Sequence, residues 1–206
     1  MLITVQHARN WVEKMNSKIQ ENKEYLTSLD QAIGDGDHGI NMARGFNEVV
    51  KKVSGSEYDT VSDLLKDVAM TLMSMVGGAS GPLFGTAFLK MSMAVKGEEA
   101  INYDGFTKAV DQALQGIVQR GKAKEGDKTM VDVWTPVLRC LLGSEAFDPD
   151  QLMVTAKTAM EGTKDTMAIK GRAAYLKQRS IGHLDPGSVS SFYLFESLAE
   201  VIKEEG

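Results

Sequence analysis

Hydrophobic residues recur at helical spacing along most of the chain. In residues 61–76, "VSDLLKDVAMTLMSMV", the apolar positions follow the i, i+3, i+4, i+7 pattern of one helix face. Residues 105–121 repeat this pattern and end at Gly121, a residue type that often terminates helices. The same spacing predicts six further helices, at 5–28, 39–53, 82–95, 130–142, 149–168 and 189–203.

The pattern therefore predicts eight helices and contains no convincing strand. Most connections between the helices are short, so consecutive helices should run antiparallel. The sequence contains no internal repeat, linker-like segment or low-complexity tract. We therefore expect a single all-α domain over residues 1–206, built from eight antiparallel amphipathic helices.

The composition limits the class of protein. With 43% hydrophobic residues, the 206-residue chain can bury a substantial core, and its net charge of −5 argues against a broad nucleic-acid-binding surface. Cys140 is the only cysteine, which excludes an internal disulfide and a thiolate zinc site. The N-terminus lacks the apolar stretch of a signal peptide, and no apolar run is long enough to span a membrane. We therefore expect a soluble cytoplasmic protein.

Three aspartates and three glycines crowd into residues 30–42, "DQAIGDGDHGINM". Asp30, Asp35 and Asp37 would repel one another unless a cation neutralises them, and their hard oxygen atoms suit Mg²⁺ or Ca²⁺. When Asp35 is counted as the first position of an EF-hand loop, the twelfth position is Phe46 rather than Glu, which excludes that calcium motif. A magnesium site and an Asp/Gly turn that caps a helix both remain open.

His38 and Asn41 follow the acidic residues at the start of a predicted helix. Backbone N–H groups at such a position favour anions, so both side chains are candidates for contact with a phosphate. A single histidine is more often structural, but the neighbouring acidic cluster strengthens the functional interpretation of His38.

A second glycine-rich segment, "GGASGPLFGTAF", covers residues 77–88. Its glycines allow close approach of the backbone to a ligand, and Pro82 suits the first turn of a helix. Ser80 is able either to cap that helix or to bind a phosphate. A tight connection between two helices would explain the glycines equally well.

Residues 121–129, "GKAKEGDKT", nearly match the spacing of a Walker A motif. Asp127 interrupts the required Gly-Lys pair, and the preceding residues are helical rather than strand-like, so a P-loop is excluded. Residues 126–129 still form a plausible helix start close to a ligand.

The third unusual segment, residues 171–191, combines basic residues with the turn sequence Asp185-Pro186-Gly187. Arg172 and Arg179 are candidates for phosphate contact, and the turn is a candidate for contact with a base or ribose. An ordered loop before a helix that Ser188 caps is the alternative, and the residues alone do not decide between the two.

The order of the helices predicts where the unusual segments lie. If the helices alternate in direction, the connections after the first, third, fifth and seventh helices share one end of the molecule. These connections are residues 29–38, 77–81, 121–129 and 169–188. We therefore expect one functional face that includes all of the unusual segments.

Three of these motifs together resemble the nucleotide-binding (L) subunits of bacterial phosphoenolpyruvate-dependent dihydroxyacetone kinases. The motifs are "AIGDGDHGINMARGF", "GGASGPLFGTAF" and "RSIGHLDPGSVSS", and the similarity extends in order over nearly the whole chain. The chain departs from the family pattern at Ala174, Lys177 and Gln178, where the family often has Ser, Gly and Glu. This departure concerns details of substrate or partner recognition rather than the nucleotide site.

The resemblance implies an up-and-down barrel of eight helices with the nucleotide site at one end. It implies that Asp30, Asp35 and Asp37 hold two Mg²⁺ ions against the phosphates, and that His38 is a catalytic residue that positions a phosphate. The implied nucleotide-binding residues are His38, Asn41, Gly78, Ala79, Ser80, Gly121, Met130, Arg179, Asp185, Pro186 and Gly187.

The resemblance also implies a reaction and its partners. A phosphotransferase-system phosphoprotein would convert bound ADP to ATP, and the γ-phosphoryl group would then pass to dihydroxyacetone on a separate subunit. A second copy of the chain is a further candidate partner, whereas nucleic acid and membrane are not expected. Two alternatives remain: the nucleotide-binding subunit of an ATP-dependent or differently targeted related kinase, and a non-enzymatic regulatory partner of a transcription factor.

Overall fold

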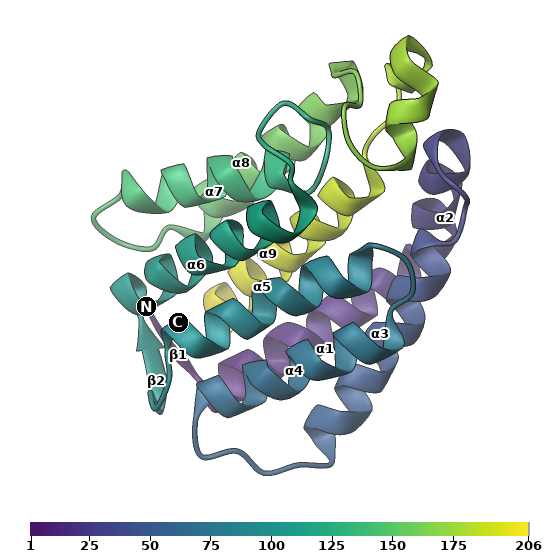
Figure 1. Ribbon diagram of the computed structural model, residues 1–206. Coiled ribbons are helices and arrows are strands. Elements are labelled where there is room, and N and C mark those ends of the chain that lie inside the picture. The colour runs from purple at the N-terminus through teal and green to yellow at the C-terminus, as the bar shows by residue number, and fades with distance from the viewer. Residues whose placement is uncertain (206) are drawn as a thin grey trace.

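The computed structural model describes residues 1–205 and is almost entirely helical (Figure 1). Within these residues, the chain forms nine α-helices, two 3₁₀ helices and two short strands. The elements are β1 Leu2–Thr4, α1 Val5–Glu21, α2 Lys23–Ile33, α3 His38–Ser54, α4 Val61–Met75, α5 Ser80–Ala94, β2 Ala100–Asn102, α6 Tyr103–Gly121, α7 Val131–Leu142, α8 Pro149–Gly162, η1 Thr163–Asp165, η2 Arg172–Ser180 and α9 Pro186–Glu205.

The long helices form a closed ring. From α3 to α9 each helix packs against the next, α9 packs against α1, and α1 packs against α3. Because the interior is lined by apolar side chains from all of these helices, the ring encloses one continuous hydrophobic core. The predicted all-α barrel with up-and-down connections is therefore confirmed.

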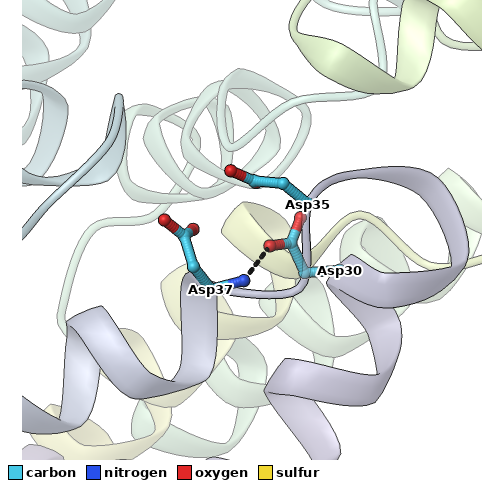
Figure 2. A group of neighbouring side chains, drawn as sticks. All are labelled: Asp30, Asp35 and Asp37. Carbon is cyan, nitrogen blue, oxygen red and sulfur yellow. Dashed lines mark hydrogen bonds between the residues drawn. The ribbon is translucent and has the colours of Figure 1, made fainter.

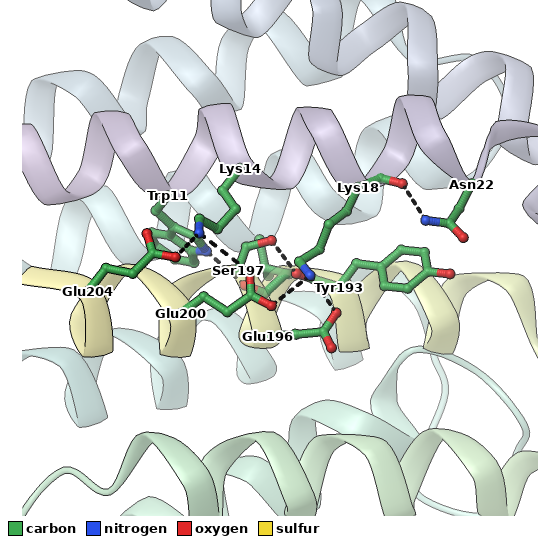
Figure 3. A network of polar contacts seen from close by, with 10 residues as sticks. Trp11, Lys14, Lys18, Asn22, Tyr193, Glu196, Ser197, Glu200 and Glu204 are labelled. Atoms are coloured by element: carbon green, nitrogen blue, oxygen red, sulfur yellow. Dashed lines mark hydrogen bonds and ion pairs between the residues drawn. The ribbon is translucent and has the colours of Figure 1, made fainter.

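Contacts between α1 and α9, the first and last long helices of the chain, close the ring. In the core, the buried Trp11 indole N–H donates to the Leu194 carbonyl at 2.8 Å. At the rim of this contact, Lys18 pairs with Glu196 and Glu200 (Figure 3). Because these contacts join residues more than 170 positions apart in sequence, they unite the two ends of the chain.

The predicted extent of the first helix, 5–28, is wrong, because this region forms the two helices α1 and α2. The chain bends at Asn22, whose backbone N–H and side-chain amide both donate to the Lys18 carbonyl. The second helix, α2, continues to Ile33, so the predicted loop 29–38 shrinks to residues 34–37. Asp30 consequently lies on a helix rather than in a loop.

Other boundaries also differ from the sequence prediction. Helix α8 ends at Gly162 instead of continuing to residue 168, and the predicted loop 169–188 contains η2 and the start of α9. The strands β1 and β2 were not predicted. They pair antiparallel through the buried Ile3 and Ile101, and at three residues each they are too short to produce a clear alternating pattern.

The two ends of the barrel differ in their structure. The small sheet lies at the end that also holds the N-terminus, whereas α2 and η2 lie at the other end (Figure 1). No helix in residues 1–205 is long and apolar enough to cross a membrane.

Candidate functional site

The acidic segment forms the junction between α2 and α3, where Asp30 organises the turn. Asp30 lies in the last turn of α2, and its Oδ2 atom accepts hydrogen bonds from the backbone N–H groups of Asp37 (2.9 Å) and His38 (3.1 Å). The Asp30 carboxylate therefore occupies the N-terminus of α3, where the helix dipole favours negative charge. Asp35 and Asp37 project from the turn, and the three carboxyl groups surround a common space (Figure 2).

The chemistry of these donors fits a hard divalent cation. One carboxylate oxygen from each of Asp30, Asp35 and Asp37 lies within 4.8 Å of the others. Mg²⁺ commonly takes a few carboxylate ligands and completes its octahedral shell with water and phosphate oxygens. The partly open turn leaves room for such additional ligands, so the residues present fit a magnesium–phosphate site.

Arg172 partly neutralises the acidic cluster. Its Nη1 atom lies 2.5 Å from Asp35 Oδ2, which joins the start of η2 to the α2–α3 turn. The Arg172 side chain is 64% exposed, so this ion pair contributes little to stability and is readily exchanged for other contacts.

His38 connects three helices below the acidic turn. Its Nδ1 atom lies 3.0 Å from Ser80 Oγ on α5, and its Nε2 atom lies 2.8 Å from Ser190 Oγ on α9. Burial lowers the pKa of His38 to about 4, although the nearby Asp30 and Asp37 favour its protonation. The imidazole is therefore neutral at pH 7, with one ring nitrogen donating and the other accepting.

The α4–α5 connection brings backbone rather than side chains to the site. Gly78 has a φ of +67°, a conformation that favours glycine, and Ser80 begins α5. The N-cap residue of α5 is Ala79, and no side chain of the described residues makes a capping hydrogen bond at this position. The first N–H groups of α5 are thus suited to an anion.

The Asp185-Pro186-Gly187 turn starts α9. Asp185 Oδ2 accepts hydrogen bonds from the Ser188 backbone N–H (2.7 Å) and hydroxyl (3.0 Å). Burial raises the pKa of Asp185 to about 6, while the bonds from Ser188 and the nearby Lys128 oppose this rise. The Ser188 hydroxyl is also 2.8 Å from the Thr129 carbonyl, so the α9 turn is tied to the α6–α7 connection.

A cavity of about 180 Å³ lies where these segments meet. Residues from all four connections that the helix order placed at one end line this cavity, which confirms the predicted common face. The predicted site residues that line it are Asp30, Asp35, Asp37, His38, Gly78, Ala79, Ser80, Met130, Asp185, Pro186 and Gly187.

Three predicted nucleotide contacts lie outside this lining. Asn41 is one turn further along α3, where its side chain accepts a hydrogen bond from Arg44. Gly121 ends α6 and faces Leu83, which does line the cavity. Arg179 lies on η2 beside a separate hollow that Met167 and Ile169 also line.

The roles of two residues that support the site were not identified from the sequence. Ser190 was not identified because it is one of several serines in the α9 sequence, and only its distance to His38 reveals its role. Lys128 was predicted only as part of the helix start 126–129 close to a ligand and was given no role of its own, yet its side chain is 1% exposed and borders the cavity. The only available signal was a lysine between the Gly126-Asp127 turn and an apolar helix start.

The sequence comparisons agree on the relatives of this chain. A family model described as "DAK2 domain" matches residues 32–200. The ADP-binding subunit DhaL of PEP-dependent dihydroxyacetone kinase 1 from Listeria innocua is 49% identical, over 94% of each chain. The corresponding PTS-dependent subunit of Lactococcus lactis is 48% identical over 98% of this chain and 100% of its own length. The subunit from Escherichia coli is 41% identical over 95% of this chain and 96% of its own length.

Solved structures share the fold. The dihydroxyacetone kinase of C. freundii in its native form matches 94% of this chain with a TM-score of 0.75 and 22% identity. The same enzyme in complex with AMP-PNP and Mg²⁺ matches with a TM-score of 0.72 and 23% identity. This chain covers about a third of that longer kinase, 34% and 33% in the two structures. The family model and the bacterial relatives confirm the resemblance found in the three motifs, and the chain belongs to the DAK2 domain family.

Proposed function

We propose that this chain is the nucleotide-binding subunit of a phosphoenolpyruvate-dependent dihydroxyacetone kinase. In this function, the subunit keeps ADP bound with Mg²⁺, and a phosphotransferase-system phosphoprotein rephosphorylates the ADP. The γ-phosphoryl group then passes to dihydroxyacetone on a partner subunit. Two bacterial relatives that carry the name of this subunit match the chain over at least 94% of both lengths, which supports the proposal.

The acidic cluster at the cavity is the observation that carries the proposal. Asp30, Asp35 and Asp37 offer three carboxylate oxygens within 4.8 Å of one another at the edge of a cavity. We propose that these residues hold two Mg²⁺ ions. Bound Mg²⁺ would neutralise charge on the phosphate oxygens, which is the main requirement of phosphoryl transfer.

The role that fits His38 is to position Ser80 and the N-terminus of α5. Because both of its ring nitrogens contact serine hydroxyls, the imidazole fixes Ser80 at the N-terminus of α5 relative to α3 and α9. A neutral imidazole adds no charge to the acidic cluster. His38 would therefore act by placing Ser80 and the first α5 N–H groups against a phosphate.

The remaining lining suits the rest of the nucleotide. The backbone around Gly78 and Ala79 and the turn at Pro186 and Gly187 line the same cavity, and Met130 adds an apolar side chain to its wall. Asn41, Gly121 and Arg179 remain predicted contacts. Asn41 and Arg179 would reach the nucleotide through a shift of their side chains or of η2, whereas Gly121, at the end of α6, would contact it through its backbone.

The partners follow from the same proposal. A dihydroxyacetone-binding subunit and a phosphotransferase-type donor would both approach the end of the barrel that carries the cavity, because the phosphoryl group must enter and leave there. A second copy of the chain is a further candidate partner.

A related kinase that uses exchangeable ATP is the second candidate function. Its supporting observation is that the domain also occurs within longer kinases, of which this chain covers about a third. The two candidates differ in nucleotide exchange: slow exchange of bound ADP supports the subunit, whereas rapid turnover with free ATP supports the alternative.

The variant Asp37→Asn tests the metal role directly. It keeps the size of the side chain but removes the negative charge, so affinity for Mg²⁺·ADP should fall by at least about tenfold, as expected for a lost metal ligand. Calorimetric titration measures the affinity, and circular dichroism should show unchanged helix content.

Asp104→Asn is the matched control, because it makes the same change at an exposed residue in the first turn of α6. Its affinity for Mg²⁺·ADP should equal that of the wild type. An Asp37→Asn variant with wild-type affinity would refute the assignment of the metal site.

A further inference from the structure

Lys128 is a buried lysine next to the nucleotide cavity. It follows the turn formed by Gly126 and Asp127, has a φ of +62°, and is only 1% exposed. Burial lowers its pKa, while Asp185 and Asp165 raise it. Because a buried ammonium group is costly unless it is fully hydrogen-bonded, its presence here requires specific partners.

Those partners are three backbone carbonyls. Lys128 Nζ donates to the carbonyl oxygens of Thr166 (3.1 Å), Ser180 (2.6 Å) and His183 (2.6 Å). An ammonium group has three N–H donors and no acceptor, so these bonds use its full capacity. A phosphate contact would have to replace one of them.

All three carbonyls belong to residues 163–185, the connection that carries η1 and η2. The turn before α7 makes one more bond to this connection, from the Ile169 backbone N–H to the Asp127 carbonyl at 3.1 Å. Within the connection, the Gly182 N–H donates to the Lys164 carbonyl at 2.7 Å. Lys128 therefore lies at the point where both ends of the connection and the α6–α7 turn meet.

This connection forms one wall of the cavity. It contributes Lys170, Gly171 and Arg172 to the lining and leads directly into the α9 turn at Asp185. In a segment with no α-helix or strand, a few such anchors determine the position of the backbone.

We propose that Lys128 is a positioning residue that clamps residues 163–185 against the nucleotide cavity, and that it does not act as a phosphate-binding lysine. The clamp is formed by protein groups alone, because the three N–H donors of Lys128 Nζ bond to the carbonyls of Thr166, Ser180 and His183. The proposal rests on the proposed function only in taking Mg²⁺·ADP as the ligand of the cavity.

Hydrogen exchange and calorimetry on the full chain test the clamp. In nucleotide-free Lys128→Met, the amides of Ala168, Ile169 and Gly182 should exchange at least about tenfold faster, whereas amides in α4 and α5 should be unchanged. Affinity for Mg²⁺·ADP should also fall by at least about tenfold, because one wall of its site has become mobile.

Two variants serve as controls. Lys128→Arg keeps the charge and offers N–H donors, so it should retain more of the exchange protection and affinity than Lys128→Met does. Lys124→Met makes the same change at an exposed lysine four residues away and should affect neither quantity. If Lys128→Met does not fold, Lys128→Gln, which retains two N–H donors, replaces it under the same criteria.

Two results would overturn the proposal. Lost Mg²⁺·ADP affinity with unchanged nucleotide-free exchange would make Lys128 a direct phosphate ligand. Faster exchange of residues 163–185 with unchanged affinity would leave it a purely structural residue. If the wild type itself bound no Mg²⁺·ADP, the nucleotide function would fail, and the exchange measurements would still decide whether Lys128 holds the connection.

Discussion

Gly34 illustrates how a single residue preserves the geometry of the acidic cluster. It follows the last turn of α2 and lies directly against the Asp30 side chain. A Cβ atom at this position would lie 2.0 Å from Asp30 Oδ1 and 3.0 Å from the Asp30 carbonyl oxygen. Any other residue would therefore force the Asp30 carboxylate away from the N–H groups of Asp37 and His38.

We predict that Gly34→Ala disturbs the metal site more than the fold. Displacing the carboxylate should cost about 1–3 kcal/mol of stability, the usual effect of an inserted methyl group at a tightly packed site. It should also reduce Mg²⁺·ADP affinity by about tenfold or more, because a ligand leaves its position. Calorimetric titration and denaturant unfolding measure the two effects separately.

Gly162→Ala is the control for this substitution. Gly162 has a φ of −59°, and no atom of the described residues apart from its own helix and chain neighbours lies within 4 Å of an added Cβ atom. The change should be neutral or slightly stabilising, since alanine favours helix. Equal affinities in the two alanine variants would contradict the role assigned to Gly34.

At the level of single elements, the sequence predicted the helices better than their ends. The stretch 61–76 was predicted almost to the residue, because its apolar stripe is long and Thr60 caps its start through the Asp63 N–H. The division of 5–28 into α1 and α2 was missed, because Asn22 bends the chain without a proline or glycine to mark the position. Local patterns specify a helix, whereas the surrounding packing determines where it ends.

The candidate site shows the same contrast between what local sequence patterns reveal and what long-range packing determines. The aspartates and glycines of the acidic segment were identified because their residue types are unusual at that density. The contacts of Lys128 were not identified, because its three carbonyl partners lie 38 to 55 positions further along the chain. Long-range contacts of an ordinary residue type leave no local signal in one sequence.

The α1–α9 contact allows a prediction about what closes the barrel. Trp11→Phe removes the hydrogen bond to the Leu194 carbonyl and part of the core volume, and should lower the free energy of unfolding by about 1–3 kcal/mol. Lys14→Met removes partly exposed ion pairs to Glu200 and Glu204 (Figure 3) and should cost less than about 1 kcal/mol. Urea unfolding of both variants compares them, and a larger loss for Lys14→Met would show that charge pairing, rather than the core, closes the ring.

At the scale of the whole molecule, the direction of the helices explains why the functional segments meet. Alternating helices bring every second connection to the same end, and the described residues at that end come from four connections distant in sequence. The closed ring of helices fixes the ends of these connections relative to one another. This arrangement was predictable from the number of helices. Although the first predicted helix is divided into α1 and α2, the barrel within residues 1–205 still has eight long helices, so the same connections lie at the same end.

The central claim is that this cavity holds a nucleotide through Mg²⁺ and the three aspartates. The most direct measurement is to purify the protein with Mg²⁺ present throughout, denature it, and identify the nucleotide and metal that it releases. Our account predicts ADP or ATP in near-equimolar amount, together with magnesium. Release of neither nucleotide, combined with no binding of added Mg²⁺·ADP, would contradict it.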